Sequence, residues 1–256
     1  MRTIAFRSFV LGALAALTVG PSAFAGLGQV VASFAAPAAN PSGLAWAKGD
    51  LYCFCETSPY LIWKVNPNNG KVLGSFKFAK AGADTVGLAH DGKYLWAGNG
   101  ATDVVYRLEW GGSVAASFKA GWNVGRGFTW SGFHLWGTER SGEPPYSYFQ
   151  IRVDGKVLKS FTNYYEIYDP AWDGRYLWVP EYDDFAKKFQ VVAVDVSNGT
   201  GVASFTAPAE EARGSTYDGS YLWLGTAAGN GRLWKVDVRG IGVAPDSLGR
   251  VKVLFK

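Results

Sequence analysis

One sequence pattern occurs five times along this chain and restricts its fold more than any other feature. Each copy has a Gly-Leu-Ala-Trp-like segment, a turn, a Tyr-Leu-Trp-like segment, a Lys-Val-Asp-like segment and a Ser-Phe ending. The copies are marked by a Leu-aromatic pair at Leu51-Tyr52, Leu95-Trp96, Leu135-Trp136, Leu177-Trp178 and Leu222-Trp223. Successive pairs are therefore 44, 40, 42 and 45 residues apart.

A repeat of this length, made of short strands and turns, is typical of one four-stranded blade of a β-propeller. Turn signals such as Asp91-Gly92 lie between the first two strands, and they predict two-residue hairpins because Asp-Gly accepts positive φ angles. One blade cannot bury both faces of its own sheet, so the five copies must stack around an axis. The sequence predicts an all-β, five-bladed propeller that forms a single domain over residues 26–256.

The repeated aromatic residues are expected to fill the space between blades. Trp96, Trp136, Trp178 and Trp223 recur in register, with Tyr52 in the fifth place. A row of Trp could also stack on sugars, but residues repeated in register favour a core role.

The two ends of the chain offer alternative ways to close the ring. Five repeat openings stand against six possible final strands, because Arg250 to Phe255 resembles the Ser-Phe endings. Either this C-terminal strand or the N-terminal strand Val30 to Phe34 completes the last blade, and closure removes exposed sheet edges. We favour the N-terminal strand.

The first 25 residues have the composition of a secretory signal peptide. Arg2 and Arg7 provide a basic start, the apolar stretch from Phe9 to Val19 is too short to span a bilayer as a helix, and Ala23-Phe24-Ala25 fits a cleavage site. We expect cleavage before Gly26, a periplasmic or secreted protein, and no membrane span in the mature chain. A retained N-terminal anchor is the alternative.

Charge and cysteine content exclude several classes of partner. The net charge of +4 falls to +2 when Arg2 and Arg7 are removed, and Lys and Arg do not cluster, so we expect no nucleic-acid partner. The only cysteines, Cys53 and Cys55, are two apart in a predicted strand, where a strained disulfide and two buried thiols are both possible. Neither His90 nor His134 has a spacing that would complete a metal site with them, and we expect no metal and no cofactor.

The repeated string Gly-Leu-Ala-Trp-x-Gly-x-Tyr-Leu-Trp, followed by x-Lys-Val-Asp and Val-x-x-Ser-Phe, resembles secreted bacterial five-bladed propellers of the glutaminyl-peptide cyclotransferase-like and NHL/YVTN-like kind. The resemblance covers about residues 30–255. The resemblance implies the fold. It does not imply a particular function, because such repeats occur in enzymes, ligand binders and scaffolds alike. The cyclotransferase-like enzymes have Phe-Thr-Gln-Gly-Leu in their first blade, and this chain has Asn40-Pro41-Ser42-Gly43-Leu44. The resemblance therefore does not imply cyclotransferase activity for this chain.

In propellers of this kind the first strands line the central channel, and ligands meet the face that carries the connections between blades. Aligning the five copies shows where polar residues break the repeat. Four places after the Leu of the second strand stand Cys55, Asn99, Glu139, Glu181 and Thr226. Immediately before the Gly of the first strand, or the Pro that replaces it, stand Ser42, Val86, Arg126, Asp169 and Arg213.

We expect Arg126 and Arg213 at the channel mouth, within reach of Glu139 or Glu181 and beside aromatic side chains. Such a mouth could hold a small polar ligand or a peptide end. The predicted ligand-binding residues are Arg126, Arg213, Glu139, Glu181, Asn99, Asp169, Trp122, Tyr165 and Tyr182. The alternative is that Arg and Glu form internal salt bridges that hold the blades in register.

No motif for a catalytic triad, a zinc protease or a phosphate-binding loop is present in the sequence. The sequence favours a monomeric binding module that holds a small polar ligand, a peptide or a protein on its variable-loop face. One alternative is a cyclotransferase-like or lyase-like enzyme with Glu139 or Glu181 as its base. A structural protein of the cell envelope is a further alternative.

Overall fold

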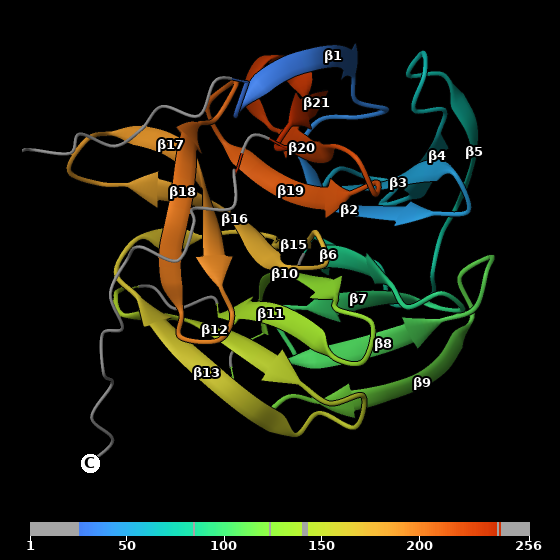
Figure 1. Cartoon of the computed structure of the whole chain (residues 1–256). Coiled ribbons are helices and arrows are strands. Elements are labelled where there is room, and N and C mark those ends of the chain that lie inside the picture. The colour runs from blue at the N-terminus through green and yellow to red at the C-terminus, as the bar shows by residue number, and fades with distance from the viewer. Residues whose placement is uncertain (1–25, 84, 123, 140–142, 240, 242–256) are drawn as a thin grey trace, which may run out of the picture.

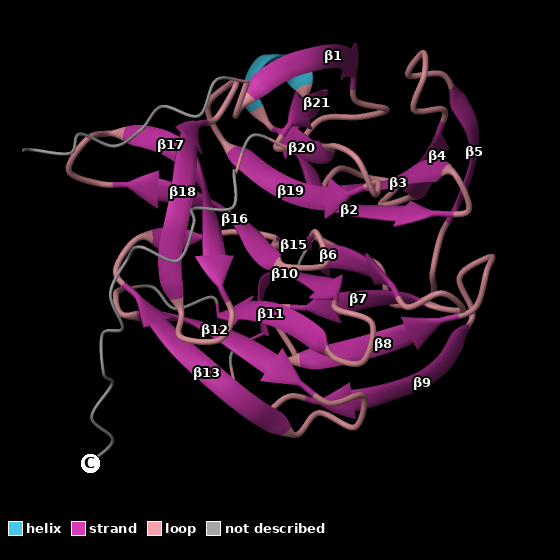
Figure 2. Cartoon of the chain, in the orientation of Figure 1, coloured by secondary structure: helices cyan, strands magenta, loops and turns pink. Residues whose placement is uncertain are grey.

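The chain forms five antiparallel sheets arranged as a ring (Figure 1), which confirms the predicted five-bladed propeller. The computed structural model describes residues 26–83, 85–122, 124–139, 143–239 and 241. The predicted signal peptide and the segment from Arg250 to Phe255 lie outside the described residues. Strands make up nearly all of the regular structure in the described part of the chain, with one short helical turn, η1 (Ala228–Asn230) (Figure 2).

The first three blades each contain four strands in chain order. Blade one contains β2 (Pro41–Ala47), β3 (Asp50–Cys55), β4 (Ile62–Val65) and β5 (Val72–Phe76). Blade two contains β6 (Thr85–His90), β7 (Leu95–Asn99), β8 (Val104–Leu108) and β9 (Val114–Lys119). Blade three contains β10 (Val124–Trp130), β11 (Leu135–Glu139), β12 (Tyr146–Ile151) and β13 (Val157–Asn163). The first strands of successive blades contact one another around the axis.

Blade four departs from this plan because its first strand is divided into two short pieces. Blade four contains β14 (Glu166–Ile167), β15 (Ala171–Trp172), β16 (Tyr176–Asp183), β17 (Lys188–Asp195) and β18 (Thr200–Thr206). The gap in the first strand falls at Tyr168–Pro170, where Pro170 replaces the Gly of the other copies. Pro lacks the N–H that the ladder needs, so the strand is interrupted there.

The N-terminal strand completes blade five, as predicted. That blade contains β19 (Ala212–Tyr217), β20 (Leu222–Thr226), β21 (Arg232–Asp237) and β1 (Gln29–Ala35). Figure 1 shows β1 in blue lying against β21 in red, and the two strands pair from Gln29 with Asp237 to Ala35 with Arg232. A Cβ on Gly70 of blade one would meet the Phe34 ring, so β1 also contacts the next blade.

The predicted two-residue hairpin is present in blade one only. There Ala47 pairs with Asp50 across Lys48 and Gly49, whose φ angles are 52° and 82°. In the other blades four residues separate the paired ends, as between Tyr217 and Leu222. The expectation of a two-residue turn was wrong for these blades. In blades two, four and five the Asp side chain, rather than a left-handed Asp backbone, shapes the turn. In blade three the hydroxyl of Ser131 donates to the backbone oxygen of His134 instead.

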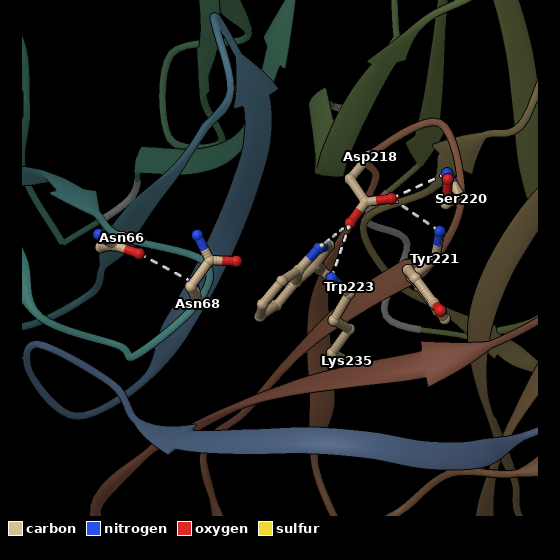
Figure 3. A network of polar contacts seen from close by, with 7 residues as sticks. All are labelled: Asn66, Asn68, Asp218, Ser220, Tyr221, Trp223 and Lys235. Carbon is tan, nitrogen blue, oxygen red and sulfur yellow. Dashed lines mark hydrogen bonds and ion pairs between the residues drawn. The ribbon is translucent and has the colours of Figure 1, made fainter.

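Figure 3 shows this turn in blade five. One carboxylate oxygen of Asp218 accepts hydrogen bonds from the backbone N–H groups of Ser220 (2.8 Å) and Tyr221 (2.7 Å). The other accepts a bond of 2.9 Å from Nε1 of Trp223. Asp91 and Asp173 hold Trp96 and Trp178 in the same way. The turn therefore satisfies the only polar atom of a buried indole side chain.

The repeated Trp side chains belong to the core, as predicted. Trp96, Trp136, Trp178 and Trp223 are buried, as is Tyr52. Each Trp packs on the Phe of the outermost strand of its own blade, with ring centroids 6.0–6.4 Å apart. Burial of this kind leaves the indoles unavailable to a ligand.

The channel closes at the glycines of the first strands. A Cβ on Gly43 would meet the backbone of Gly87, and a Cβ on Gly87 would meet the backbone of Gly127. A Cβ on Gly127 would overlap the carboxylate of Asp169. The backbones thus approach too closely for any side chain, which explains why the repeat places Gly at this position.

Candidate functional site

A cavity of about 320 Å³ lies at the channel mouth, above the ring of glycines. We call it the mouth cavity. Residues from all five blades line it, including Val86 of blade two, and its polar and charged residues are Ser42, Glu56, Arg126, Glu166, Tyr168 and Arg213. The cavity is at the low end of the size range of small-molecule sites. Of the residues expected at the mouth, Ser42, Val86, Arg126 and Arg213 line this cavity and Asp169 does not.

Two arginines give the mouth cavity its charge pattern, although their partners differ from those expected. Arg126 forms a close ion pair with Glu166, and its guanidinium lies 4.4 Å from the centroid of the Tyr168 ring. Burial raises the pKa of the Tyr168 hydroxyl to about 12, against the opposing effect of Arg126, so Tyr168 stays protonated at neutral pH. These contacts anchor Arg126 in the wall.

Arg213 is held more loosely than Arg126. Its Nη1 is 3.8 Å from Glu56, and its Nη2 is 3.9 Å from Glu211. Both distances exceed those of hydrogen-bonded ion pairs. Arg213 therefore faces two carboxylates without a close bond to either, and Glu139 and Glu181 are not among its ion-pair partners in the described structure.

Two donors beside the mouth cavity lack hydrogen-bond partners among the described residues. They are the hydroxyl of Ser42, a residue that is 4% exposed, and Nε of Arg213. Buried polar groups in folded proteins are nearly always satisfied. Four other buried side-chain atoms also lack partners among the described residues, on His90, Arg107, Trp122 and Arg232, but those residues line neither cavity. Ser42 and Arg213 both line the mouth cavity, where a bound ligand could complete them.

A second cavity of about 600 Å³ adjoins the first, between blade four and the connection that leads into blade five. We call it the side cavity. It shares Glu166, Tyr168 and Arg213 with the mouth cavity. Its floor is aromatic, because the Phe189 ring lies 5.7 Å from Tyr168 and 4.9 Å from Tyr182. Of the predicted site residues, Tyr182 lines only the side cavity, whereas Arg213 lines both cavities.

Asp169 was predicted to bind ligand, and the structure places it in the closed part of the channel instead. Its side chain is fully buried and accepts backbone N–H bonds from Leu44 (3.3 Å), Phe128 (2.7 Å) and Ser215 (3.3 Å). These donors belong to blades one, three and five. Burial raises the pKa of the Asp169 carboxyl well above its usual range, while the three N–H donors oppose that rise. Asp169 therefore fastens four blades to one another at the axis.

The interrupted strand of blade four explains why Asp169 was misplaced. Aligning the copies on Pro170 put Asp169 where Arg126 and Arg213 stand in their own blades. With the strand divided, the Asp169 side chain bonds to the other first strands, and Tyr168 and Glu166 line the mouth in its place.

Glu181 is part of a buried hydrogen-bond network and lines neither cavity. Its Oε1 accepts bonds of 2.7 Å from the Tyr148 hydroxyl and from Nδ2 of Asn163. Burial raises the pKa of Glu181, and these bonds lower it in part. Its position in the second strand, behind the first, keeps it away from the channel. This arrangement holds β16 to blade three.

The other predicted residues have local contacts and do not line the two cavities. Asn99 accepts bonds from the backbone of Ala101 and Thr102 and shapes the loop after β7. Trp122 packs on Phe149, with centroids 5.4 Å apart, and Tyr165 is 37% exposed in the connection before β14. Glu139 ends β11 and pairs with Val124.

Sequence reasoning missed two carboxylates, Glu56 and Glu166. Glu56 follows β3 directly, one place beyond the predicted polar ring, and Glu166 begins β14, the first piece of the divided first strand of blade four. The usable signal was the excess of charge in these segments, which the repeat does not require. Only the ring geometry shows that Glu166 reaches Arg126.

Neither metal-binding clusters nor membrane helices occur in the described residues. They contain no group of three or more His, Cys, Asp or Glu that could hold a metal ion. In the same part of the chain no helix has the length and apolar character needed to cross a membrane. Cys53 and Cys55 are buried free thiols with their Sγ atoms 3.6 Å apart, which decides the question that the sequence left open.

Comparison with known proteins gives structural neighbours only. No family model matches the chain, and no curated protein matches it in sequence. Among solved structures, Myxococcus xanthus glutaminyl cyclase is similar with a TM-score of 0.63 and 15% identity, over 82% of this chain and 96% of the cyclase. The Cps50 (Swd1) β-propeller domain of Myceliophteria thermophila has a TM-score of 0.50 and 9% identity, over 82% of this chain and 99% of that domain. At these identities the likeness concerns the fold, and the chain is a five-bladed β-propeller.

Proposed function

We propose that this protein is a binding module, exported to the periplasm or beyond, that holds a small polar ligand through a carboxylate in the mouth cavity. The observation that carries the proposal is the pair of unpartnered donors, Ser42 Oγ and Arg213 Nε, beside that cavity. Arg213 Nε can only donate and the Ser42 hydroxyl can donate as well, so one acceptor satisfies both, and a carboxylate suits a planar guanidinium. The N-terminal sequence supports export.

The charges of the mouth cavity favour a ligand that places a single carboxylate there over a dianion. Arg126 and Arg213 are balanced by Glu56 and Glu166 around the same cavity. One carboxylate adds one negative charge to this balance, whereas a dianion adds two. A volume near 320 Å³ has room for an amino acid.

No observation favours the enzyme alternative with Glu139 or Glu181 as base, because neither residue lines the two cavities. A base must lie within hydrogen-bond reach of the proton that it removes. The similarity to a glutaminyl cyclase, at 15% identity, supports the fold and is no argument for that activity. The third alternative, a structural protein of the envelope, would leave the unpartnered donors unexplained.

The test is a thermal-shift titration of the mature protein with alanine, glutamate, succinate and ethanolamine. Alanine and glutamate should raise the melting temperature by mass action, succinate less, and ethanolamine not at all. Arg213→Gln should abolish the shift, and Ser42→Ala should weaken binding severalfold. Arg175→Gln, which removes an exposed arginine at a distant hairpin, is the matched control and should bind normally. Equal shifts by ethanolamine and alanine, or no shift with any of them, would reject the proposal.

A further inference from the structure

The mouth cavity and the side cavity are separated by a wall of three side chains: Glu166, Tyr168 and Arg213. Arg213 extends to both sides of this wall. One end of its guanidinium faces Glu56 in the mouth cavity, and the other faces Glu211 in the side cavity. A ligand bound to Arg213 therefore lies next to the side cavity as well.

The side cavity has different chemistry from the mouth. Tyr168, Tyr182 and Phe189 supply aromatic surface, in which both Tyr rings are tilted against Phe189, and Ala209 also lines the cavity. Charged residues at its edge include Lys188 and Glu210, both of which are exposed. Apolar surface bordered by polar groups of both signs suits an apolar side chain attached to a backbone with hydrogen-bonding groups.

We propose that the ligand is the carboxyl end of a peptide: the terminal carboxylate binds between Arg213 and Ser42, and the preceding side chain occupies the side cavity. The inference rests on the proposed function, since it uses the same carboxylate site. A free amino acid would leave the larger cavity of about 600 Å³ without an occupant. A chain that continues past the wall fills both.

The unpartnered groups determine which end of the peptide enters the mouth. Arg213 Nε is a donor only and needs an acceptor, which the carboxyl end provides and an ammonium group does not, and the Ser42 hydroxyl can donate to the same acceptor. Of the mouth carboxylates, Glu166 is engaged in a close ion pair with Arg126, and Glu56 lies 3.8 Å from Nη1 of Arg213. The peptide therefore enters with its carboxyl end and extends with its amino end outward over the side cavity.

Isothermal titration of the mature protein with three probes tests this assignment: N-acetyl-Gly-Phe-Ala with a free carboxylate, its C-terminal amide, and free alanine. The free-acid peptide should bind at least tenfold more tightly than alanine, and the amide should lose at least tenfold. Ala209→Trp fills the side cavity and should bring the peptide to the affinity of alanine without changing alanine binding. Ala101→Trp, on an exposed loop outside both cavities, is the matched control.

The outcomes separate this inference from the proposed function. If alanine binds as tightly as the peptide, or if Ala209→Trp binds the peptide normally, the mouth binds a free acid and the peptide assignment is wrong. If the amide binds as well as the free acid, the carboxyl end is not what is recognised. If neither alanine nor the peptide binds, the proposed function itself fails. A folded state for each variant is checked by near-ultraviolet circular dichroism.

Discussion

Asp169 shows how one departure from the repeat can serve the whole ring. Blades one, two, three and five have Gly at the axis, where the backbones approach closely, whereas blade four has Asp169-Pro170. The carboxylate uses the space that Gly127 leaves and bonds to three other first strands. These bonds join residues that lie in different blades, and the buried N–H groups would be left unpaired without the Asp169 carboxyl.

Gly127→Ala should lower the free energy of unfolding by about 3 kcal/mol, because its methyl group would displace the Asp169 carboxylate and leave buried N–H groups unpaired. Urea denaturation measures the change. Gly121→Ala is the matched control, since a Cβ there meets no atom within 4 Å, and it should change stability by less than about 1 kcal/mol. Equal effects of the two substitutions would contradict the proposed role of the axis.

Glu181 should make stability depend on pH in a defined direction. Burial raises its folded-state pKa above the unfolded value of about 4.3, so its stabilising contribution is complete below that pH and is lost as pH rises through the folded pKa. Glu181→Gln does not titrate, and the amide oxygen can still accept from Tyr148 and Asn163. The variant should therefore gain stability relative to the natural protein as pH rises above about 4.

Urea denaturation at several pH values measures that difference, and Glu210→Gln, at an exposed position, serves as the matched loss of charge. The stability gain of Glu181→Gln over the natural protein should grow as pH rises. If it stays constant or shrinks, Glu181 is not buried as described.

At the scale of elements, the decisive feature is that β1 belongs to the last blade. Nη2 of Arg232 in β21 donates to the Ser33 hydroxyl at 2.7 Å, and Phe34 stacks on Trp223 with centroids 6.2 Å apart. The same ring covers Gly70 of blade one. The strand thus contributes to the sheet of blade five and to the contact between blades five and one.

Deleting residues 26–35 should remove cooperative unfolding and promote aggregation, because β21 becomes an open edge and Trp223 loses its cover. Calorimetry and size-exclusion chromatography measure the two effects. Truncation after Ile241 is the comparison, and it should leave the melting temperature nearly unchanged because β1 already closes the ring. If the C-terminal truncation were the more damaging one, Arg250 to Phe255 would have to take part in closure.

Most of the elements could be predicted because every blade packs against its neighbours with similar residues at equivalent positions. The Trp and Phe positions recur for that reason, and they fixed the number of blades and the core. Hairpin geometry could not be read from Asp-Gly, since the role of Asp218 depends on Trp223 five residues later. The site was harder still, because Arg126 of blade three pairs with Glu166 of the neighbouring blade four, and no repeat position encodes that pair.

At the scale of the whole molecule, the two cavities arise because the five blades of the closed ring differ at the mouth end of the channel. The first strands of all blades meet at the axis, and the residues that precede their glycines gather around the mouth cavity. The division of the first strand in blade four admits Tyr168 and Glu166 to this mouth and opens the way to the side cavity. A difference between repeats thus creates the asymmetry that a specific site needs.

Export is a property of the whole chain and can be tested directly. Expressed in a bacterial host with its own N-terminus, the protein should be recovered outside the cytoplasm with Gly26 as its first residue. N-terminal sequencing of the purified material identifies the start. Ala25→Leu places a large residue at the cleavage site and should slow processing, whereas a natural protein that still begins at Met1 would argue against a signal peptide.

The pairing of β1 with β21 also sets the order of events during folding. Ser33 and Arg232 bond across 199 residues, and contacts of such long range form slowly. Until β21 is available, β1 has no partner strand in the sheet it completes, and its Val30 and Val31 remain apolar side chains on an unpaired edge. A growing chain can assemble its first four blades in turn, but residues 212–237 decide when residues 29–35 can fold.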